Sequence, residues 1–285
     1  MSPPAAVYPA PAKLNLFLHV LGRRPDGYHL LQTAFRFIDY GDELSFAVRD
    51  DGKIRRLTPI AGIDEEQDLI VRAARLLQAE TSCRSGADIG IVKRLPMGGG
   101  LGGGSSDAAT TLIVLNRLWK TGLSRTRLQE IGLRLGADVP VFVFGRNAFA
   151  EGVGERLQPL DLPPACYLVL APELAVSTAE IFAAPELTRH SNAITIAAFS
   201  VGLARSIPGR NDLEPVVCRR YPPVEQHLEW LRRFGDARMT GSGACVFCAF
   251  SNEGKARRAL SELPPGMKGF VARGLDRHPL YLEGE

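Results

Sequence analysis

The sequence predicts an α+β fold in which helices pack on mostly antiparallel sheets. The expected strands and helices are interleaved, but they do not follow a strict βαβ alternation. A length of 285 residues corresponds to about two domains, and the proline-rich stretch 159–164 has the composition of a domain boundary. We therefore expect an N-terminal domain over residues 1–158 and a C-terminal domain over residues 159–285.

The N-terminal half is expected to open with strands. Residues 13–20 alternate, so that four aliphatic side chains share one face while Lys13, Asn15, Phe17 and His19 share the other. The polar side chains of such a strand normally face water. Further strands are expected at 35–38, 44–48 and 89–92, and a helix is expected over 69–77 with Asp68 as its N-cap.

A glycine tract follows the strand at 89–92. Residues 98–104 read Gly-Gly-Gly-Leu-Gly-Gly-Gly, and Ser-Ser-Asp-Ala-Ala comes next. Ordering so much glycine costs chain entropy, and folding alone gives no reason for that cost. Apolar residues then recur at helical spacing up to Gly122, with Ser105 or Ser106 as the expected N-cap and Asp107 in the first turn. Exposed N–H groups before a helix form an anion site, so the tract is predicted to be a phosphate-binding loop.

Other glycine-rich motifs fit this tract less well. A Walker loop needs a lysine after its last glycine, but Ser105 follows Gly104. A dinucleotide fingerprint needs an acidic residue about 20 residues further on, at the end of a second strand. The first acidic residue after Asp107 is Glu130, inside another expected helix. The protein-kinase motifs are absent, and a flexible linker would not be flanked so closely by periodic apolar segments.

The remaining elements follow in order. Ser124 is expected to cap a helix that ends at Gly136, and Asp138 lies in a turn before Pro140 and an expected strand over 141–144. Further strands are expected at 167–171, 244–250 and 269–273, and further helices at 177–183, 192–204, 223–234 and 253–262. A second glycine cluster at 240–244 is either a simple hairpin turn or a second backbone wall near the phosphates.

Composition restricts the classes of partner. The net charge is only +3 and the arginine pairs are scattered, which does not favour nucleic-acid binding. No apolar run reaches the length of a membrane span, and the N-terminus lacks a signal core, so we expect a cytoplasmic protein. Five cysteines, an odd number, fit a reducing compartment, and Cys245 and Cys248 are expected in the core.

To catalyse phosphoryl transfer, a protein mainly has to position the two substrates and stabilise the charge on the transferring group. The glycine tract supplies donors for phosphates. Asp138 offers a carboxylate for an acceptor hydroxyl, and Lys13 offers a cation with Asn15 beside it on the same strand face. Patterning alone does not separate these side chains from ordinary solvated ones.

Five segments together resemble the GHMP (galacto-, homoserine, mevalonate and phosphomevalonate) kinase superfamily. In chain order, they are Pro-Ala-Lys-Leu-Asn-Leu at 11–16, Gly-Arg-Arg-Pro-Asp-Gly-Tyr-His at 22–29, the glycine tract with its flanks at 95–106, Gly-Ala-Asp-Val-Pro at 136–140 and Thr-Gly-Ser-Gly-Ala at 240–244. The likeness runs from about residue 9 to about residue 275. The first two segments narrow it to the family that phosphorylates 4-diphosphocytidyl-2-C-methyl-D-erythritol.

The resemblance implies a two-domain kinase fold with the active site in the cleft between the domains. It also implies a role for each matching position. Lys13 and Asp138 match the catalytic pair. The implied ATP-binding residues are Lys93, Pro96, Met97, Gly98, Gly99, Gly100, Leu101, Gly102, Gly103, Gly104, Ser105 and Ser106. The implied substrate-binding residues are Asn15, Tyr28, His29, Thr178 and Phe182, with Tyr28 and His29 at the cytidine. Segment 184–210 does not align, and no role is assigned to it.

The implied reaction moves the γ-phosphoryl group of ATP to the C2 hydroxyl of the methylerythritol unit, a step of the non-mevalonate isoprenoid route. ATP is then the co-substrate and Mg²⁺ an expected cofactor, with Ser106 and Asp107 only candidates as its ligands. Two alternatives remain: a GHMP kinase for another small alcohol such as homoserine or mevalonate, and a nucleotide-binding module without activity. A dehydrogenase ranks lower. No protein partner is predicted.

Overall fold

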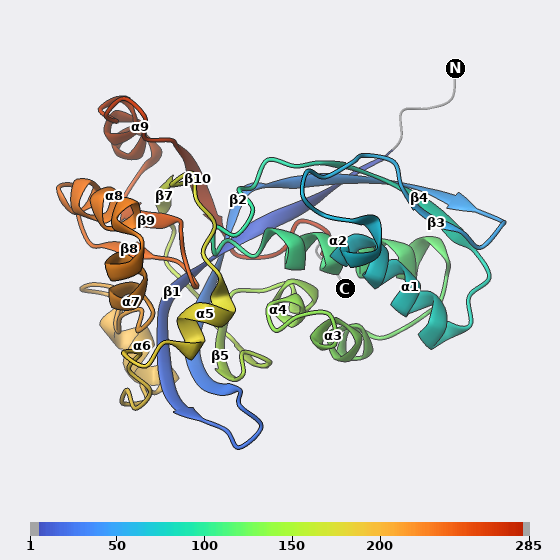
Figure 1. Cartoon of the computed structure of the whole chain (residues 1–285), viewed down its shortest axis with the longest axis horizontal. Helices are drawn as coiled ribbons and strands as arrows, with labels where there is room; N and C mark the ends of the chain where they lie inside the picture. The colour runs from blue at the N-terminus through green and yellow to red at the C-terminus, as the bar shows by residue number, and fades with distance from the viewer. Residues whose placement is uncertain (1–5, 282–285) are drawn as a thin grey trace.

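The computed structural model describes residues 6–281, and a mixed sheet runs through both halves of the molecule (Figure 1). Its main path joins β3 (Ile54–Arg56), β4 (Gly86–Val92), β2 (His29–Arg49), β10 (Gly269–Leu275), β7 (Cys166–Leu170), β9 (Val246–Phe250) and β8 (Ala237–Met239). Branching from this path, β1 (Val7–Arg23) and β5 (Ala148–Gly152) pair with β2, and β6 (Arg156–Pro159) pairs with β5. Only β3 and β4 pair in parallel, which confirms the mostly antiparallel prediction.

The helices fall into two groups. The first comprises α1 (Leu69–Thr81), α2 (Gly103–Leu118), α3 (Arg125–Leu133) and α4 (Val139–Phe144), preceded by a 3₁₀ turn at Glu65–Gln67. The second comprises α5 (Thr178–Ala183), α6 (Ile196–Gly202), α7 (Glu214–Arg220), α8 (Pro222–Arg232) and α9 (Glu253–Ser261). Figure 1 shows the first group beside β3 and β4, and α6 to α9 at the opposite end of the molecule.

Each group of helices covers its own apolar cluster. One cluster packs α1, α2 and α4 against β2 and β4, and another packs α7 and α8 against β7 and β9. The sheet is nevertheless continuous, because β10 from the end of the chain pairs with β2. The division at 158/159 stays a prediction.

Strand β1 is buried along most of its length. The periodicity correctly predicts a strand, but every residue from 10 to 20 is buried, including Lys13 and Asn15. The polar face of this strand therefore does not meet water, unlike that of an ordinary alternating strand. β1 lies against α2 and also contributes Leu14, Leu16 and Phe17 to a third apolar cluster.

Two local predictions on the N-terminal side are also wrong. Residues 141–144 belong to helix α4, with Pro140 in its first turn, where a missing N–H costs nothing. Every residue from 139 to 143 is buried, so the run lacks the periodicity that separates a helix from a strand. Helix α2 begins at Gly103 after a left-handed Gly102, so neither Ser105 nor Ser106 is its N-cap.

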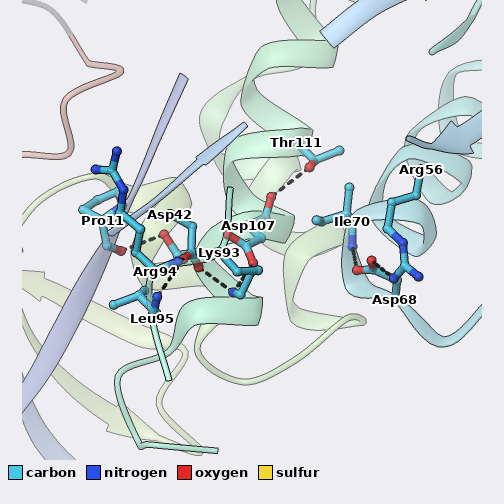
Figure 2. A network of polar contacts seen from close by, with 11 residues as sticks. Pro11, Asp42, Arg56, Asp68, Ile70, Lys93, Arg94, Leu95, Asp107 and Thr111 are labelled. Carbon is cyan, nitrogen blue, oxygen red and sulfur yellow. Dashed lines mark hydrogen bonds and ion pairs between the residues drawn. The ribbon is translucent and has the colours of Figure 1, made fainter. Parts of the chain in front are cut away.

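The predicted cap of α1 is confirmed. Asp68 accepts a hydrogen bond from the backbone N–H of Ile70 at 2.9 Å. Its second oxygen lies 2.6 Å from Nη1 of Arg56, and both side chains are almost fully buried (Figure 2). One carboxylate therefore joins β3 to the start of α1.

Among the described residues, no helix is long and apolar enough to cross a bilayer.

We predict that Asp68→Ala lowers the free energy of unfolding by about 3 kcal/mol, because it removes a helix cap and leaves a buried guanidinium without its partner. Asp68→Asn keeps an acceptor for the helix N-terminus and should cost clearly less. Urea unfolding of both variants measures the difference. Equal, small losses for the two variants would contradict the structural role of this carboxylate.

Candidate active site

One cavity of about 510 Å³ collects most of the residues that the sequence singled out. Its wall is the glycine tract, and Lys13, Asn15 and Asp138 lie along it. The other predicted residues that line it are Lys93, Pro96, Met97, Gly98, Gly99, Gly100, Leu101, Gly102, Gly103, Gly104, Ser105, Thr178 and Phe182. Segments from both halves of the chain thus meet at a single hollow.

The ammonium group of Lys13 is held by three acceptors. Nζ lies 3.1 Å from Oδ2 of Asp138, 2.5 Å from Oδ1 of Asn15 and 3.0 Å from the carbonyl oxygen of Gly100. A lysine has three N–H donors, so all of them are used within the protein. The side chain is only 3 % exposed, and its charge is therefore fixed in place and weakly screened by water.

Asp138 occupies the N-cap position of α4 and is 35 % exposed toward the cavity. One of its oxygens pairs with Lys13, while the other has no protein partner among residues 6–281. A carboxylate that is open to a cavity can accept a proton from a bound hydroxyl. The same ion pair places positive charge beside that reacting centre.

The glycine tract needs glycine for two separate reasons. Gly98, Gly100 and Gly102 have φ values of +67°, +74° and +72°, which favour glycine. At Gly100 there is also no room, since a Cβ there would lie 2.2 Å from the carbonyl oxygen of Thr240. Gly103 has no positive φ, and a Cβ there meets Leu95 at 3.3 Å. The left-handed backbone of the tract therefore ends before Gly103.

The second glycine cluster, residues 240–244, is both a hairpin connection and a wall of the cavity. It joins β8 to β9, and Gly241 and Ser242 line the cavity. The buried hydroxyl of Thr240 accepts a hydrogen bond from the N–H of Asn15 at 2.9 Å and donates one to the carbonyl of Gly100 at 3.2 Å. The same carbonyl accepts from Lys13, so Thr240 ties the second cluster to the lysine site.

A second lysine, half-buried Lys93, holds the two ends of the glycine loop. Nζ of Lys93 bonds to Oδ2 of Asp42 at 2.5 Å and to Oδ2 of Asp107 at 2.9 Å (Figure 2). Oδ1 of Asp42 accepts from the N–H groups of Arg94 and Leu95. Lys93 thus connects the strand before the loop with the helix after it.

Asp107 does not lie in the first turn of α2, as the sequence suggested, but one turn further in. Burial raises the pKa of its carboxyl to about 7, against the opposing charge of Lys93. Its Oδ1 is buried without a partner among the described residues, and Asp107 lines the cavity. Ser106 is fully buried, and its hydroxyl donates to the carbonyl of Pro11 at 2.7 Å.

The residues that the resemblance places at the cytidine, together with Phe182, lie next to one another at the rim of the cavity. Phe182 lines the cavity, and its ring centroid is 5.0 Å from that of His29. His29 is buried and does not line the cavity, while Tyr28 is 65 % exposed on the surface beside it. The hydroxyl of Thr178 lies 2.6 Å from that of Ser242.

Comparisons with known proteins agree with this geometry. Residues 68–146 match the GHMP kinases N-terminal domain, and residues 192–267 match the GHMP kinases C-terminal domain. The 4-diphosphocytidyl-2-C-methyl-D-erythritol kinase of Thiobacillus denitrificans is 64 % identical over 274 residues, covering 96 % of this chain and 97 % of that one. The chain belongs to this family of GHMP kinases. Membership makes it an ATP-dependent phosphotransferase, with ATP as its co-substrate.

Further relatives support the same family. A protein of the same name from Chromobacterium violaceum is 56 % identical over 289 residues, covering all of both chains. A crystal structure of 4-(cytidine 5'-diphospho)-2C-methyl-D-erythritol kinase matches with a TM-score of 0.82 at 34 % identity, covering 94 % of this chain and 99 % of that one. The mevalonate kinase of Methanococcus jannaschii shares the fold. It matches with a TM-score of 0.66 at 16 % identity, covering 96 % of this chain and all of that one.

Sequence reasoning missed the residues that act through hydrogen bonds to distant segments. Thr240 was noted only as part of a glycine cluster, and Asp42 was not noted at all. Arg189, which contacts both His29 and the backbone near Phe182, lies in the segment that could not be aligned. A buried hydroxyl, carboxylate or guanidinium of this kind leaves no periodic pattern in the sequence.

We predict opposite effects for alanine at two glycines of the loop. Gly100→Ala should abolish ATP binding and lower the melting temperature, because the left-handed backbone alone costs about 1–2 kcal/mol for an L-residue and the new methyl group meets Thr240. Gly104→Ala should keep or raise the melting temperature, since it lies inside α2 with only Leu69 at 3.4 Å. Thermal melts and titration with an unhydrolysable ATP analogue test both; similar melts for the two variants would contradict the geometry.

We predict that Thr240→Val lowers kcat and destabilises the protein by about 1–3 kcal/mol, the usual cost of leaving a buried polar group unpaired. Valine has nearly the same shape but offers no hydroxyl to Asn15 or Gly100. Thr240→Ser keeps the hydroxyl and should retain most of the activity and stability. If serine and valine behave alike, the hydroxyl does not position the lysine site.

Proposed function

We propose that this kinase transfers the γ-phosphoryl group of ATP to the C2 hydroxyl of 4-diphosphocytidyl-2-C-methyl-D-erythritol, a step of the non-mevalonate isoprenoid route. The observation that carries the proposal is the 3.1 Å ion pair between Lys13 and Asp138, set on the cavity between the glycine loop and the rim that bears Phe182. A phosphate-binding wall and a stacking surface thus flank one acid–base pair.

In this proposal, each residue acts through an ordinary property of its side chain. Asp138 orients the acceptor hydroxyl and takes its proton. Lys13 pairs with that carboxylate and stabilises the charge on the transferring group. The N–H groups of the loop and the start of α2 bind the β- and γ-phosphates.

The residues around the loop fit a magnesium ion that arrives with the nucleotide. The described residues hold no cluster of three or more His, Cys, Asp or Glu side chains suited to a metal. Mg²⁺ commonly binds through one or two carboxylates together with substrate phosphates, however, and Asp107 and Asp138 both line the cavity. Asp107 has a buried, unpaired oxygen available for this purpose. When bound, the ion neutralises the triphosphate.

The substrate-side residues support the cytidylyl acceptor over the other alcohols of the superfamily. An aromatic side chain at the rim, such as Phe182 or Tyr28, can stack on a nucleobase, which homoserine and mevalonate lack. The mevalonate and homoserine kinases among the structural neighbours are only 13–16 % identical and share the fold alone.

A coupled ATP-consumption assay tests the proposal. We expect turnover with 4-diphosphocytidyl-2-C-methyl-D-erythritol and little or none with homoserine or mevalonate at the same concentrations. Faster turnover with either small alcohol would favour the alternative substrate class. ATP binding without turnover of any of the three would favour an inactive nucleotide-binding module.

Asp138→Asn should reduce kcat by about 10²–10⁴-fold, the usual contribution of a general base, because the amide keeps the shape but cannot take a proton. Affinity for ATP and for the acceptor should change little. Steady-state kinetics with both substrates measure this, and Glu130→Gln on the exposed face of α3 serves as a control carboxylate. Near-normal kcat in Asp138→Asn would remove the assignment of the base.

A further inference from the structure

Arg189 lies in the loop between α5 and α6 and binds four acceptors. Its Nε–H donates to Nε2 of His29 at 3.1 Å. Nη1 donates to the carbonyl of Leu187 at 3.1 Å, and Nη2 donates to the carbonyls of Phe182 and Ala184 at 2.9 and 2.7 Å. The planar guanidinium is suited to this arrangement, because its five donors point in fixed directions.

These bonds join two segments that are far apart in the sequence. His29 begins β2, whereas Phe182 lies near the end of α5. The two rings pack with centroids 5.0 Å apart and an interplanar angle of 32°. Arg189 contacts the imidazole of one and the backbone carbonyl of the other, so a single side chain holds the pair together.

The arginine also determines which nitrogen of His29 carries hydrogen. A guanidinium can only donate, so Nε2 must present its lone pair, and a neutral imidazole then carries its hydrogen on Nδ1. Nδ1 has no hydrogen-bond partner among residues 6–281, yet it is not a buried unpaired atom, so it remains accessible. Burial and then the charge of Arg189 lower the pKa of His29, which keeps the ring neutral.

We propose that Arg189 is a positioning residue for base recognition: it joins His29 to Phe182 and makes Nδ1 of His29 a fixed hydrogen-bond donor. This inference rests on the proposed cytidylyl substrate. A fixed donor favours cytosine, whose N3 is an acceptor, over uracil, whose N3 carries hydrogen. Without Arg189 the imidazole is free to exchange tautomers, and the preference for cytosine decreases.

A second arginine supplies a matched control. Arg220 donates to the carbonyl of Glu180 at 3.4 Å and pairs with Glu186, so it holds the same stretch of chain. It has no contact with His29. A role limited to anchoring this stretch would give Arg189→Ala and Arg220→Ala similar effects on base binding.

The experiment measures the binding of cytidine 5'-diphosphate and uridine 5'-diphosphate by calorimetry. In Arg189→Ala, we expect the affinity for the cytidine nucleotide to fall by about tenfold, equal to about 1.4 kcal/mol, while that for the uridine nucleotide changes much less. Arg220→Ala should keep the wild-type ratio of the two affinities. An unchanged ratio in Arg189→Ala would overturn the proposal.

Nitrogen NMR of His29 gives the readout that a merely structural role would not change. The wild type should show the Nδ1–H tautomer and a titration midpoint below the usual value of about 6.5. In Arg189→Ala the tautomers should mix and the midpoint should rise. Arg189→Lys is measured as a second variant, and its result is used if the alanine variant does not fold. A single ammonium group cannot bind all four acceptors, so the lysine variant should also loosen the contact with His29. A single, unchanged tautomer in a folded Arg189 variant would contradict the proposal.

The binding and NMR measurements do not depend on turnover. If the wild type binds cytidine 5'-diphosphate with the expected preference but consumes no ATP with the proposed acceptor, the proposed function fails and the role of Arg189 stands. If the wild type turns over the acceptor but the Arg189 variants keep the cytidine preference, the role of Arg189 fails and the proposed function stands.

Discussion

The buried ammonium group of Lys13 is the interaction on which the rest of the site depends. An ammonium group that is only 3 % exposed has lost its hydrogen bonds to water, and burying it is unfavourable unless acceptors in the protein replace them. Three acceptors from three parts of the chain do so. Asn15 comes from β1, Gly100 from the glycine loop and Asp138 from the start of α4. The strand, the loop and the helix therefore have to meet at one point, and that point is where an acceptor hydroxyl can reach Asp138.

A second, half-buried lysine makes the loop itself a defined structure. Lys93 bridges Asp42 and Asp107, so the strand before the loop and the helix after it are held together. Thr240 then braces the middle of the loop through the carbonyl of Gly100. Six glycines in seven residues would otherwise be costly to order. With both ends and the middle held, the backbone N–H groups remain available for a ligand without needing side chains of their own.

Features set by neighbouring residues could be predicted from the sequence, while features set by distant contacts could not. The Asp68 cap, the strand over residues 13–20 and the strand–loop–helix order are local, and the structure confirms them. Residues 141–144 belong to helix α4 but are expected as a strand from the sequence, because burial on all sides removes the periodicity that distinguishes a helix. Thr240 carries no local pattern, since its partners Gly100 and Asn15 lie 140 and 225 residues away in the sequence. The contact of Arg189 with His29 likewise spans 160 residues. The resemblance implies that Lys13 and Asp138 are a catalytic pair, and the structure shows the two side chains in contact through a buried ammonium group.

The coupling between Lys13 and Asp138 is the most direct test of this account. Steady-state kcat is measured for Lys13→Ala, Asp138→Asn and the double variant, with folding of each checked by thermal melting. If the two residues act as one unit, either substitution alone already removes their joint contribution to kcat. The double variant is then little slower than the slower single variant. If the losses multiply, the two side chains act independently, and the ion pair is not the centre of the site.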